Sequence, residues 1–271
     1  MRKFSSYGPV DKELHFYVPR EELIQRGHLE LVGENPEKGG HYITVWAPRQ
    51  CGKTWIMNEI LHRLGEDERF HVLKLELEDL KTTEDADEIV SSIAEEIIEE
   101  LSLKNVRIGR LKELKRLFRN DVLDRPLILI LDEFDALTEE GISGLASVFR
   151  NIYNIRRRDP NSSVKKRYLL HSVALIGVRN VLGIENAKGS PFNVQRSLPI
   201  PNLTYSEVQS MFRWYERESS QKVETEVLER LFCETRGQPG LVSWFGELLT
   251  EGYEDYHPDH TRPASAVRHG S

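Results

Sequence analysis

The feature that most constrains this sequence is the segment APRQCGKT at residues 47–54. An apolar run at residues 42–46 precedes it and predicts a short buried strand, and a helical pattern at residues 52–64 follows it. Phosphate oxygens bind where several backbone N–H groups converge at the N-terminus of a helix, and glycine leaves that approach open. A strand, this loop and a helix in that order therefore predict a phosphate-binding loop.

The residue types in this loop suit ATP and Mg²⁺. We expect Lys53 to reach the β- and γ-phosphates and to act in catalysis, and the Thr54 hydroxyl to ligate Mg²⁺. The usual pattern begins with glycine, whereas Ala47 stands at that place here. The residues expected to contact the nucleotide are Ala47, Pro48, Arg49, Gln50, Cys51, Gly52, Lys53, Thr54 and Trp55.

Cys51 within this loop has two interpretations. A helix N-terminus lowers the pKa of a thiol, which would make Cys51 sensitive to oxidation. Alternatively, Cys51 is simply a small residue that fits the loop, and we favour this interpretation.

A second motif, PLILILDEFD at residues 126–135, is an apolar run that ends in acids. Removing carboxylates from water is costly, so a buried strand that ends in Asp132 and Glu133 indicates a cation or a water at that place. We expect Asp132 to hold Mg²⁺ through a water and Glu133 to act as the general base for the attacking water. Asp135 is expected to cap a helix or to support the first two acids.

Apolar runs and helical patterns alternate along the first 200 residues. Strands are predicted at residues 42–46, 71–77, 127–131 and 172–177, and helices at residues 52–64, 85–101 and 142–155. This alternation is typical of an α/β protein with a parallel sheet covered by helices on both faces. We expect the ATPase core at residues 1–200.

After the core, the pattern becomes helical. Residues 198–200 predict a last strand, and Thr204 with Glu207 forms a capping-box pattern before a helix. Two more helices are expected around residues 227–232 and 241–249. We therefore expect a small helical lid at residues 201–250 and a disordered tail at residues 251–271.

Composition narrows the location and the partners. The net charge of −7 disfavours a nucleic-acid-coating role, and two distant cysteines are typical of a reducing compartment. The longest aliphatic run, residues 127–131, is too short to cross a bilayer, and no signal peptide is visible. We expect a cytoplasmic protein without a membrane partner.

Together the two motifs resemble those of the P-loop NTPases that carry an additional strand and a catalytic glutamate. YVPREELI at residues 17–24 resembles the segment by which AAA-like and STAND ATPases contact adenine. SPFNV and LTYSEV, at residues 190–194 and 203–208, resemble the core-to-lid junction of bacterial AAA-like ATPases. TRGQPGLV at residues 235–242 resembles the Gly-x-Pro motif of their lid. The resemblance covers residues 15–250. It implies a P-loop three-layer sandwich followed by a small helical lid, with ATP bound between them.

The resemblance also implies weaker sites. HSVALIGVRN at residues 171–180 looks like the sensor strand, which would lie between the strands of the two motifs. Its end would place Asn180, or else Arg179, at the γ-phosphate, although an asparagine after a strand also suits a turn. Pro239 would pack on the base or simply separate two helices. Arg236 is a candidate lid sensor, and Pro19 and Arg20 are candidate adenine neighbours or a helix start.

A basic stretch at residues 156–167 has three interpretations. It contains Arg156, Arg157, Arg158, Lys165, Lys166 and Arg167. In ring-forming AAA ATPases this region carries an arginine that reaches the γ-phosphate of a neighbour. A solvated loop is the favoured alternative, and a nucleic-acid contact is the third.

Three functions fit these residues. The first is a hydrolysing ATPase, and the second is a slow STAND-like switch that binds nucleotide and changes partners. The third is an ATP-dependent DNA-binding protein similar to the origin-recognition ATPases. The expected partners are ATP, Mg²⁺ and either a separate effector protein or a second copy of the chain.

Overall fold

The computed structural model describes residues 1–177, 195–251 and 267–269. The chain forms two compact units. The sheet unit comprises Glu22–Pro48 and Met57–Pro199, and the helical unit comprises Met1–Glu21, Arg49–Ile56 and Ile200–Ser271. The first 21 residues and part of the phosphate loop thus group with the C-terminal helices.

The sheet unit contains a five-stranded parallel sheet with the strand order β2-β3-β4-β1-β5. Its strands are β1 Tyr42–Trp46, β2 His71–Glu76, β3 Leu127–Asp132, β4 Leu170–Gly177 and β5 Gln195–Pro199. β4 lies between β3 and β1, as expected for the strand of the sensor motif. The predicted α/β class with a parallel sheet is confirmed.

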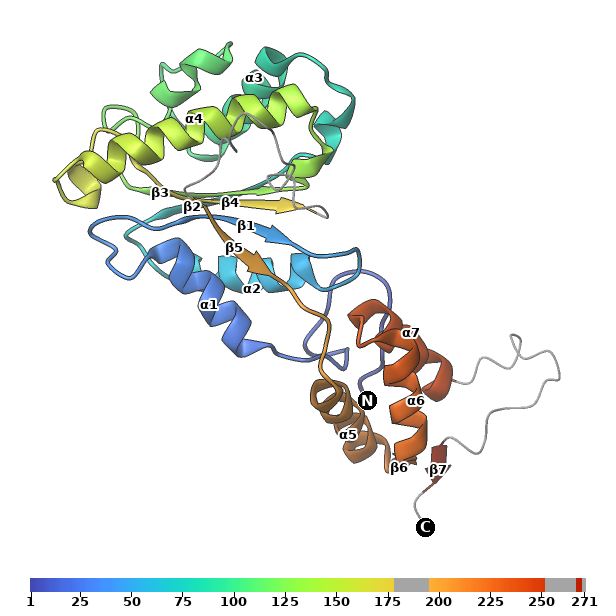
Figure 1. The fold of residues 1–271 in the computed structure, drawn as a ribbon. Coiled ribbons are helices and arrows are strands. Elements are labelled where there is room, and N and C mark those ends of the chain that lie inside the picture. Colours follow the sequence, from blue (N-terminus) through green and yellow to red (C-terminus); the bar gives the residue numbers. More distant parts are fainter. Residues whose placement is uncertain (178–194, 252–266, 270–271) are drawn as a thin grey trace. The chain divides into compact units, whose positions relative to one another are not determined.

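Helices cover both faces of this sheet (Figure 1). The α-helices of this region are α1 Glu21–Val32, α2 Lys53–Gly65, α3 Ala86–Glu100 and α4 Glu139–Arg158. α3 and α4 lie on one face, and α1 and the sheet-unit part of α2 lie on the other. Short 3₁₀ turns connect them: η1 Glu78–Thr82, η2 Leu111–Arg116, η3 Phe134–Ala136 and η4 Ser163–Lys165.

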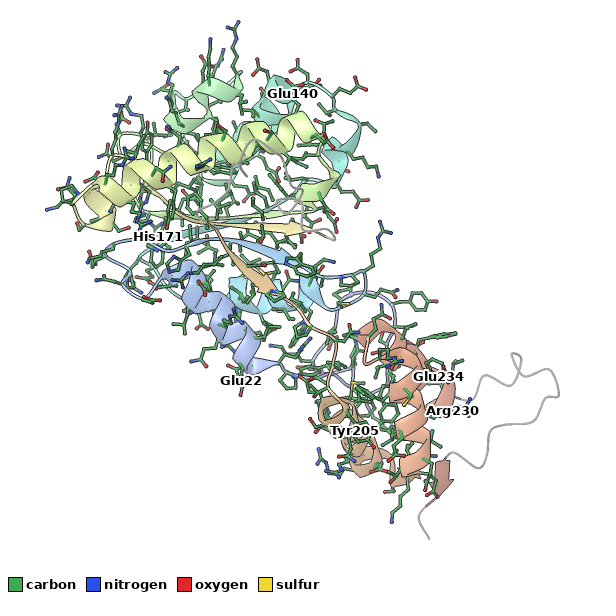
Figure 2. All side chains as sticks on the ribbon, viewed as in Figure 1. Glu22, Glu140, His171, Tyr205, Arg230 and Glu234 are labelled. Atoms are coloured by element: carbon green, nitrogen blue, oxygen red, sulfur yellow. The ribbon has the colours of Figure 1, made fainter. Side chains whose placement is uncertain are left out.

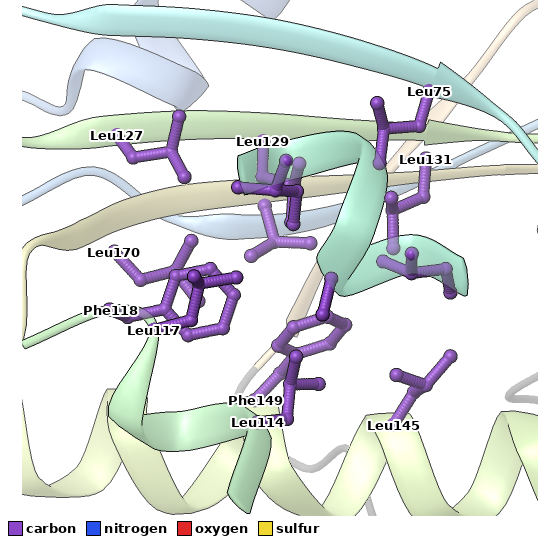
Figure 3. Close-up of a cluster of buried hydrophobic side chains, with 14 of the residues drawn as sticks. Leu75, Leu114, Leu117, Phe118, Leu127, Leu129, Leu131, Leu145, Phe149 and Leu170 are labelled. Atoms are coloured by element: carbon purple, nitrogen blue, oxygen red, sulfur yellow. The ribbon is translucent and has the colours of Figure 1, made fainter. Parts of the chain in front are cut away.

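The core of the sheet unit explains the apolar runs in the sequence. All six residues of β3 are buried, as befits a strand covered on both faces. Figure 3 shows Leu129 and Leu131 of β3 on the face toward Leu145 and Phe149 of α4. These side chains, spaced for a helix on α4 and at alternate positions on β3, pack into one cluster. The cluster holds α3 and α4 on this face of the sheet.

The helical unit contains α5 Tyr205–Ser219, α6 Thr225–Thr235 and α7 Pro239–Thr250. A short antiparallel pair, β6 Gln221–Val223 with β7 Val267–His269, belongs to the same unit. The predicted capping box is confirmed, because Thr204 Oγ1 accepts from Glu207 N–H at 3.3 Å and the Glu207 carboxylate accepts from Thr204 N–H at 2.6 Å. A helix start near Pro19 was one of two interpretations, whereas β6 and β7 were not predicted; β7 lies within the tail that was expected to be disordered.

N-terminal residues complete the core of the helical unit. The ring of Phe4 lies 5.1 Å from Phe16 and 4.7 Å from Phe212 of α5 between centroids. Tyr215 of α5 packs against both N-terminal rings. This aromatic packing explains why residues far apart in sequence form one unit. Within the described residues, no helix is both long and apolar enough to span a bilayer.

Candidate functional site

The phosphate loop leaves the sheet at its carboxyl edge. β1 ends at Trp46, and α2 begins at Lys53. Two loop residues adopt left-handed backbone conformations, Gln50 with φ 59° and Gly52 with φ 83°. Lys53 and Thr54 are the first residues of α2, and its first turn carries no acidic side chain. The positive end of the helix dipole therefore remains available to an anion.

Gly52 is required by its backbone conformation. Among the described residues, no atom lies within 4 Å of the position that a Cβ would take. Its φ of 83° nevertheless lies in the region that residues with a side chain rarely adopt. The Ile56 N–H donates to the Gly52 carbonyl at 3.0 Å and closes the first turn of α2. The glycine thus joins the loop directly to the helix N-terminus.

Within the helical unit, the start of α7 holds the loop by two hydrogen bonds. Gln238 Nε2 donates to the Arg49 carbonyl at 3.0 Å, and the Gly240 N–H donates to the Gln50 carbonyl at 3.0 Å. A Cβ on Gly240 would lie 2.6 Å from Gln50 Cβ, so the close approach needs this glycine. Because a peptide group is planar, fixing these carbonyls also fixes the directions of the next N–H groups, those of Gln50 and Cys51.

A small cavity lies beside the loop, lined only by residues of the helical unit. Its volume is about 70 Å³. The lining residues that matter here are Tyr17, Arg20, Cys51, Trp55 and Pro239. The rings of Tyr17 and Trp55 are 5.5 Å apart between centroids. The structure therefore brings the predicted adenine segment, the loop and the Gly-x-Pro motif to one cavity.

Other residues predicted beside the base have structural roles. Arg20 Nη1 donates to the Pro201 carbonyl at 2.7 Å, and Arg20 Nε lies 3.6 Å from a Glu207 carboxylate oxygen. Pro19 is exposed, and α1 begins two residues later. Arg236 ends α6 in a left-handed conformation, with φ 51°, and its side chain is exposed. Pro19 and Arg20 thus also serve the predicted helix start.

The surroundings of Cys51 agree with the favoured interpretation, a small residue that fits the loop, rather than with an oxidation-sensitive thiol. The side chain is buried, with 1% exposed, and Sγ donates to Asn202 Oδ1 at 3.6 Å. Burial raises the pKa of the Cys51 thiol, and the charges of Lys53 and Arg20 only partly oppose this. Burial thus acts against the lowered thiol pKa that oxidation sensitivity would need.

In the sheet unit, the acidic residues stand at the carboxyl end of β3. Asp132 is 6% exposed, and Glu133 follows it with φ 53° in a left-handed conformation. The Glu133 N–H donates to Asp132 Oδ1 at 3.0 Å. Non-glycine residues rarely take this conformation, so the surrounding structure must hold it. The backbone therefore turns at a defined angle where it leaves β3.

Lys74 of β2 contacts this acidic end, which the sequence interpretation did not foresee. Lys74 Nζ lies 2.9 Å from Asp132 Oδ2 and 3.0 Å from Glu76 Oε1. Burial alone would lower the pKa of the Lys74 ammonium, but its hydrogen bonds to Asp132 and Glu76 outweigh burial and raise it. A lysine inside the apolar run at residues 71–77 is the signal that could have shown this contact.

Two further predictions concern the neighbourhood of the acids. Thr138, not Asp135, caps α4, because its Oγ1 accepts from the Gly141 N–H at 3.3 Å. The Asp135 carboxylate lies against Gly177 at the end of β4, where a Cβ would come within 2.6 Å of Asp135 Oδ1. Arg179 and Asn180, predicted at the end of the sensor strand, lie outside the described residues.

The basic stretch is neither a finger at Arg156 nor a simple solvated loop. Arg156 is 4% exposed; its Nη1 donates to the Tyr168 carbonyl and its Nη2 donates to Ser163 Oγ at 3.1 Å. Lys166 is 3% exposed and donates to the Arg156 carbonyl at 2.6 Å. Both cations therefore bind their own chain, whereas Arg157 and Arg158 are exposed.

A model of the AAA-like domain family matches residues 5–251, which is most of the sequence. The chain belongs to the AAA-like domain family. The predicted resemblance to AAA-like P-loop ATPases is thereby confirmed at the level of the family. A search of curated proteins finds no match to this AAA-like chain.

Solved structures share the fold of this AAA-like chain. The Orc1 protein of Aeropyrum pernix in complex with DNA matches with a TM-score of 0.55 and 16% identity, over 91% of this chain and 63% of that chain. A Walker-type ATPase of Pyrococcus abyssi matches with a TM-score of 0.55 and 16% identity, over 92% and 71%. Cdc6p from Pyrobaculum aerophilum has a TM-score of 0.52 and 15% identity, over 87% and 62%. The AAA-like chain spans less than two thirds of the Orc1 and Cdc6p chains.

Proposed function

We propose that this AAA-like chain binds ATP with Mg²⁺ at the phosphate loop and hydrolyses it to ADP and phosphate. The conformation of the loop carries the proposal. Gly52 turns the backbone in the left-handed region directly before α2, and the helix N-terminus then presents Lys53 and Thr54. A helix N-terminus with an adjacent lysine is a general site for phosphate.

The ligand chemistry of the proposed residues fits Mg²⁺. The Thr54 hydroxyl and the Asp132 carboxylate are hard oxygen donors, which Mg²⁺ prefers. Magnesium at nucleotide sites uses one or two protein ligands together with phosphate oxygens, so no larger protein cage is needed. When bound, Mg²⁺ would neutralise charge on the phosphate oxygens. Lys53 would bind the same phosphate through its ammonium.

Glu133 is the proposed general base. Its carboxylate would take a proton from the water that attacks the γ-phosphorus. The left-handed turn at Glu133 and its N–H bond to Asp132 hold the backbone of this residue in one conformation at the end of β3. We thus propose different tasks for the two adjacent acids, metal binding for Asp132 and base catalysis for Glu133. Asn180 remains a proposed contact of the γ-phosphate.

The base of ATP is proposed to enter the cavity beside the loop. Tyr17, Trp55 and Pro239 offer apolar surfaces to a planar base there. The cavity volume of about 70 Å³ is below the roughly 300–1,000 Å³ of typical ligand sites. We therefore propose that the side chains around it, Trp55 first among them, shift when the base enters.

The experiment that tests hydrolysis is multiple-turnover phosphate release from Mg²⁺–ATP. We expect Glu133→Gln to reduce turnover by roughly a hundredfold or more while ATP still binds, since losing a general base costs about 10²–10⁴. Glu140→Gln is the control, because Glu140 is exposed in the first turn of α4 (Figure 2).

The same measurement separates an ATPase from a slow regulatory switch. A switch would release about one phosphate per chain and then stop. If Glu133→Gln releases phosphate at the wild-type rate, Glu133 is not the base. Under the switch alternative, the nucleotide state would select a separate effector protein or a second copy of the chain.

A second candidate function is ATP-dependent DNA binding, because the matched Orc1 structure contains DNA. The net charge of −7 opposes it. A shift of DNA mobility that requires ATP and weakens with salt would support this candidate.

We also propose a cytoplasmic location, since Cys51 and Cys233 are both free thiols.

A further inference from the structure

Two carboxylates face each other across β2 and β3. Glu76 stands directly opposite Asp132, and Lys74 stands opposite Ile130. Because side chains alternate along a strand, Lys74 and Glu76 lie on the same face of the sheet as Asp132. Like charges directly opposite each other destabilise a strand pair. The register alone would therefore destabilise the pairing of β2 with β3 at Glu76 and Asp132.

Lys74 compensates for this repulsion. Its ammonium contacts one oxygen of each carboxylate, at 3.0 Å for Glu76 and 2.9 Å for Asp132. The Lys74 and Asp132 side chains are only 14% and 8% exposed, so water screens their attraction weakly. The other oxygen of Asp132 accepts the Glu133 N–H. Both oxygens of the proposed Mg²⁺-site carboxylate thus already have a donor.

We propose that Lys74 is a positioning residue that competes with Mg²⁺ for Asp132 and so sets the Mg²⁺ concentration that nucleotide binding requires. This inference rests on the proposed function. A divalent ion that binds at Asp132, directly or through a water, must repel or displace the ammonium already there. The arriving ion would thereby move Lys74 away from Asp132.

Glu76 provides the place to which Lys74 withdraws. Its side chain is 75% exposed and already contacts the ammonium, so Lys74 keeps one ionic partner when it leaves Asp132. The strand does not depend on Lys74 for its position, because Leu73 and Leu75 are buried on its other face. Exchange of one cation for another can therefore occur without disturbing β2.

The test is the Mg²⁺ dependence of nucleotide binding. A non-hydrolysable ATP analogue is titrated by calorimetry at a series of Mg²⁺ concentrations, and Mn²⁺ binding to the same complex is followed by electron paramagnetic resonance. Lys74→Met should lower the half-saturating metal concentration by roughly tenfold or more, since hydrogen bonds to charged groups are strong. Glu76→Gln should raise it, because Lys74 then loses its alternative partner.

Lys81→Met is the matched control, since Lys81 is 58% exposed in η1 of the same unit and its loss also removes one positive charge. If Lys74→Met and Lys81→Met behave alike, or if Lys74→Met raises the metal requirement, the competition is wrong. The opposite shift expected for Glu76→Gln keeps the idea testable if Lys74→Met fails to fold. If the wild-type chain binds no nucleotide at any Mg²⁺ concentration, the proposed function itself fails.

Discussion

The sheet unit buries charge at both edges of its sheet, and the two edges do so differently. At the amino edge, Arg156 and His171 lie in a network closed by Ser163 and by backbone carbonyls. At the carboxyl edge, Asp132 and Glu76 share the ammonium of Lys74. At the amino edge, the buried cation is thus hydrogen-bonded to neutral acceptors. At the carboxyl edge, two carboxylates share one ammonium.

From this difference we infer that the charges at the amino edge stabilise the fold, whereas those at the carboxyl edge serve the proposed ligand. A buried cation that is hydrogen-bonded to fixed carbonyls is costly to remove. Each carbonyl that loses its donor stays buried and cannot bind water instead. A cation shared between two carboxylates can be exchanged for another cation. We expect substitutions at the amino edge to affect stability and those at the carboxyl edge to affect ligand binding.

The largest effect on stability is expected from Arg156→Ala. The substitution leaves the Tyr168 carbonyl and the Ser163 hydroxyl without a donor and opens a void, so unfolding should become easier by about 4 kcal/mol. Chemical denaturation measures this. Arg157→Ala, the exposed neighbour, should change stability by less than about 0.5 kcal/mol. Equal effects of the two substitutions would remove the distinction between the edges.

The second effect is a loss of stability in acid, caused by His171. Its Nε2 faces the Val32 carbonyl at 2.9 Å, and Nδ1 faces Ser163 Oγ at 3.1 Å, an arrangement that suits the neutral ring. Burial, aided by the charge of Arg156, lowers the pKa of His171 to about 4. Figure 2 shows His171 at the start of β4.

Between pH 6.5 and 4 only the unfolded chain binds this proton, so the free energy of unfolding should fall as the pH falls through this window. The loss should reach about 3 kcal/mol near pH 4, with no contribution from His171 above pH 6.5. Denaturation at several pH values measures it. His171→Gln should flatten the dependence, whereas His62→Gln, an exposed histidine, should not. If the free energy of unfolding of His171→Gln still falls between pH 6.5 and 4 as in the wild type, another group causes the loss.

At the carboxyl edge, Asp132→Asn is expected to affect stability less than either substitution at Arg156 or protonation of His171. The amide still accepts the Glu133 N–H, and Lys74 keeps Glu76, so stability should change by about 1 kcal/mol or less. Nucleotide binding should nevertheless lose its dependence on Mg²⁺, as calorimetry with and without the ion would show. A large loss of stability with unchanged Mg²⁺ dependence would make Asp132 a structural residue.

Local patterns were sufficient for the fold and for the two motifs. The apolar run at β3 and the Gly-Lys-Thr end of the loop predicted strand, loop and helix, because strand burial and helix N-termini follow from spacing alone. The contacts of Gln238 and Gly240 with the loop could not be predicted, since they join residues almost 190 positions apart. Such contacts depend on how the helical unit packs.

The interpretation of Arg156 failed for a reason that the sequence contains. Leu145, Phe149, Ile152 and Arg156 recur at helical spacing and are all buried on α4. The arginine therefore continues the apolar face of the helix, whereas Arg157 does not. Composition suggested a basic loop, and periodicity would have indicated a buried cation.

The proposed function depends first on binding of the ATP phosphates by the loop before α2. The most direct measurement is calorimetric ATP binding to Lys53→Ala, with Lys222→Ala, an exposed lysine of β6, as the control. We expect a dissociation constant at least roughly a hundredfold higher for Lys53→Ala, because a charge-assisted contact to phosphate is lost, and an unchanged value for Lys222→Ala. An affinity of Lys53→Ala within about twofold of the wild-type affinity would contradict it.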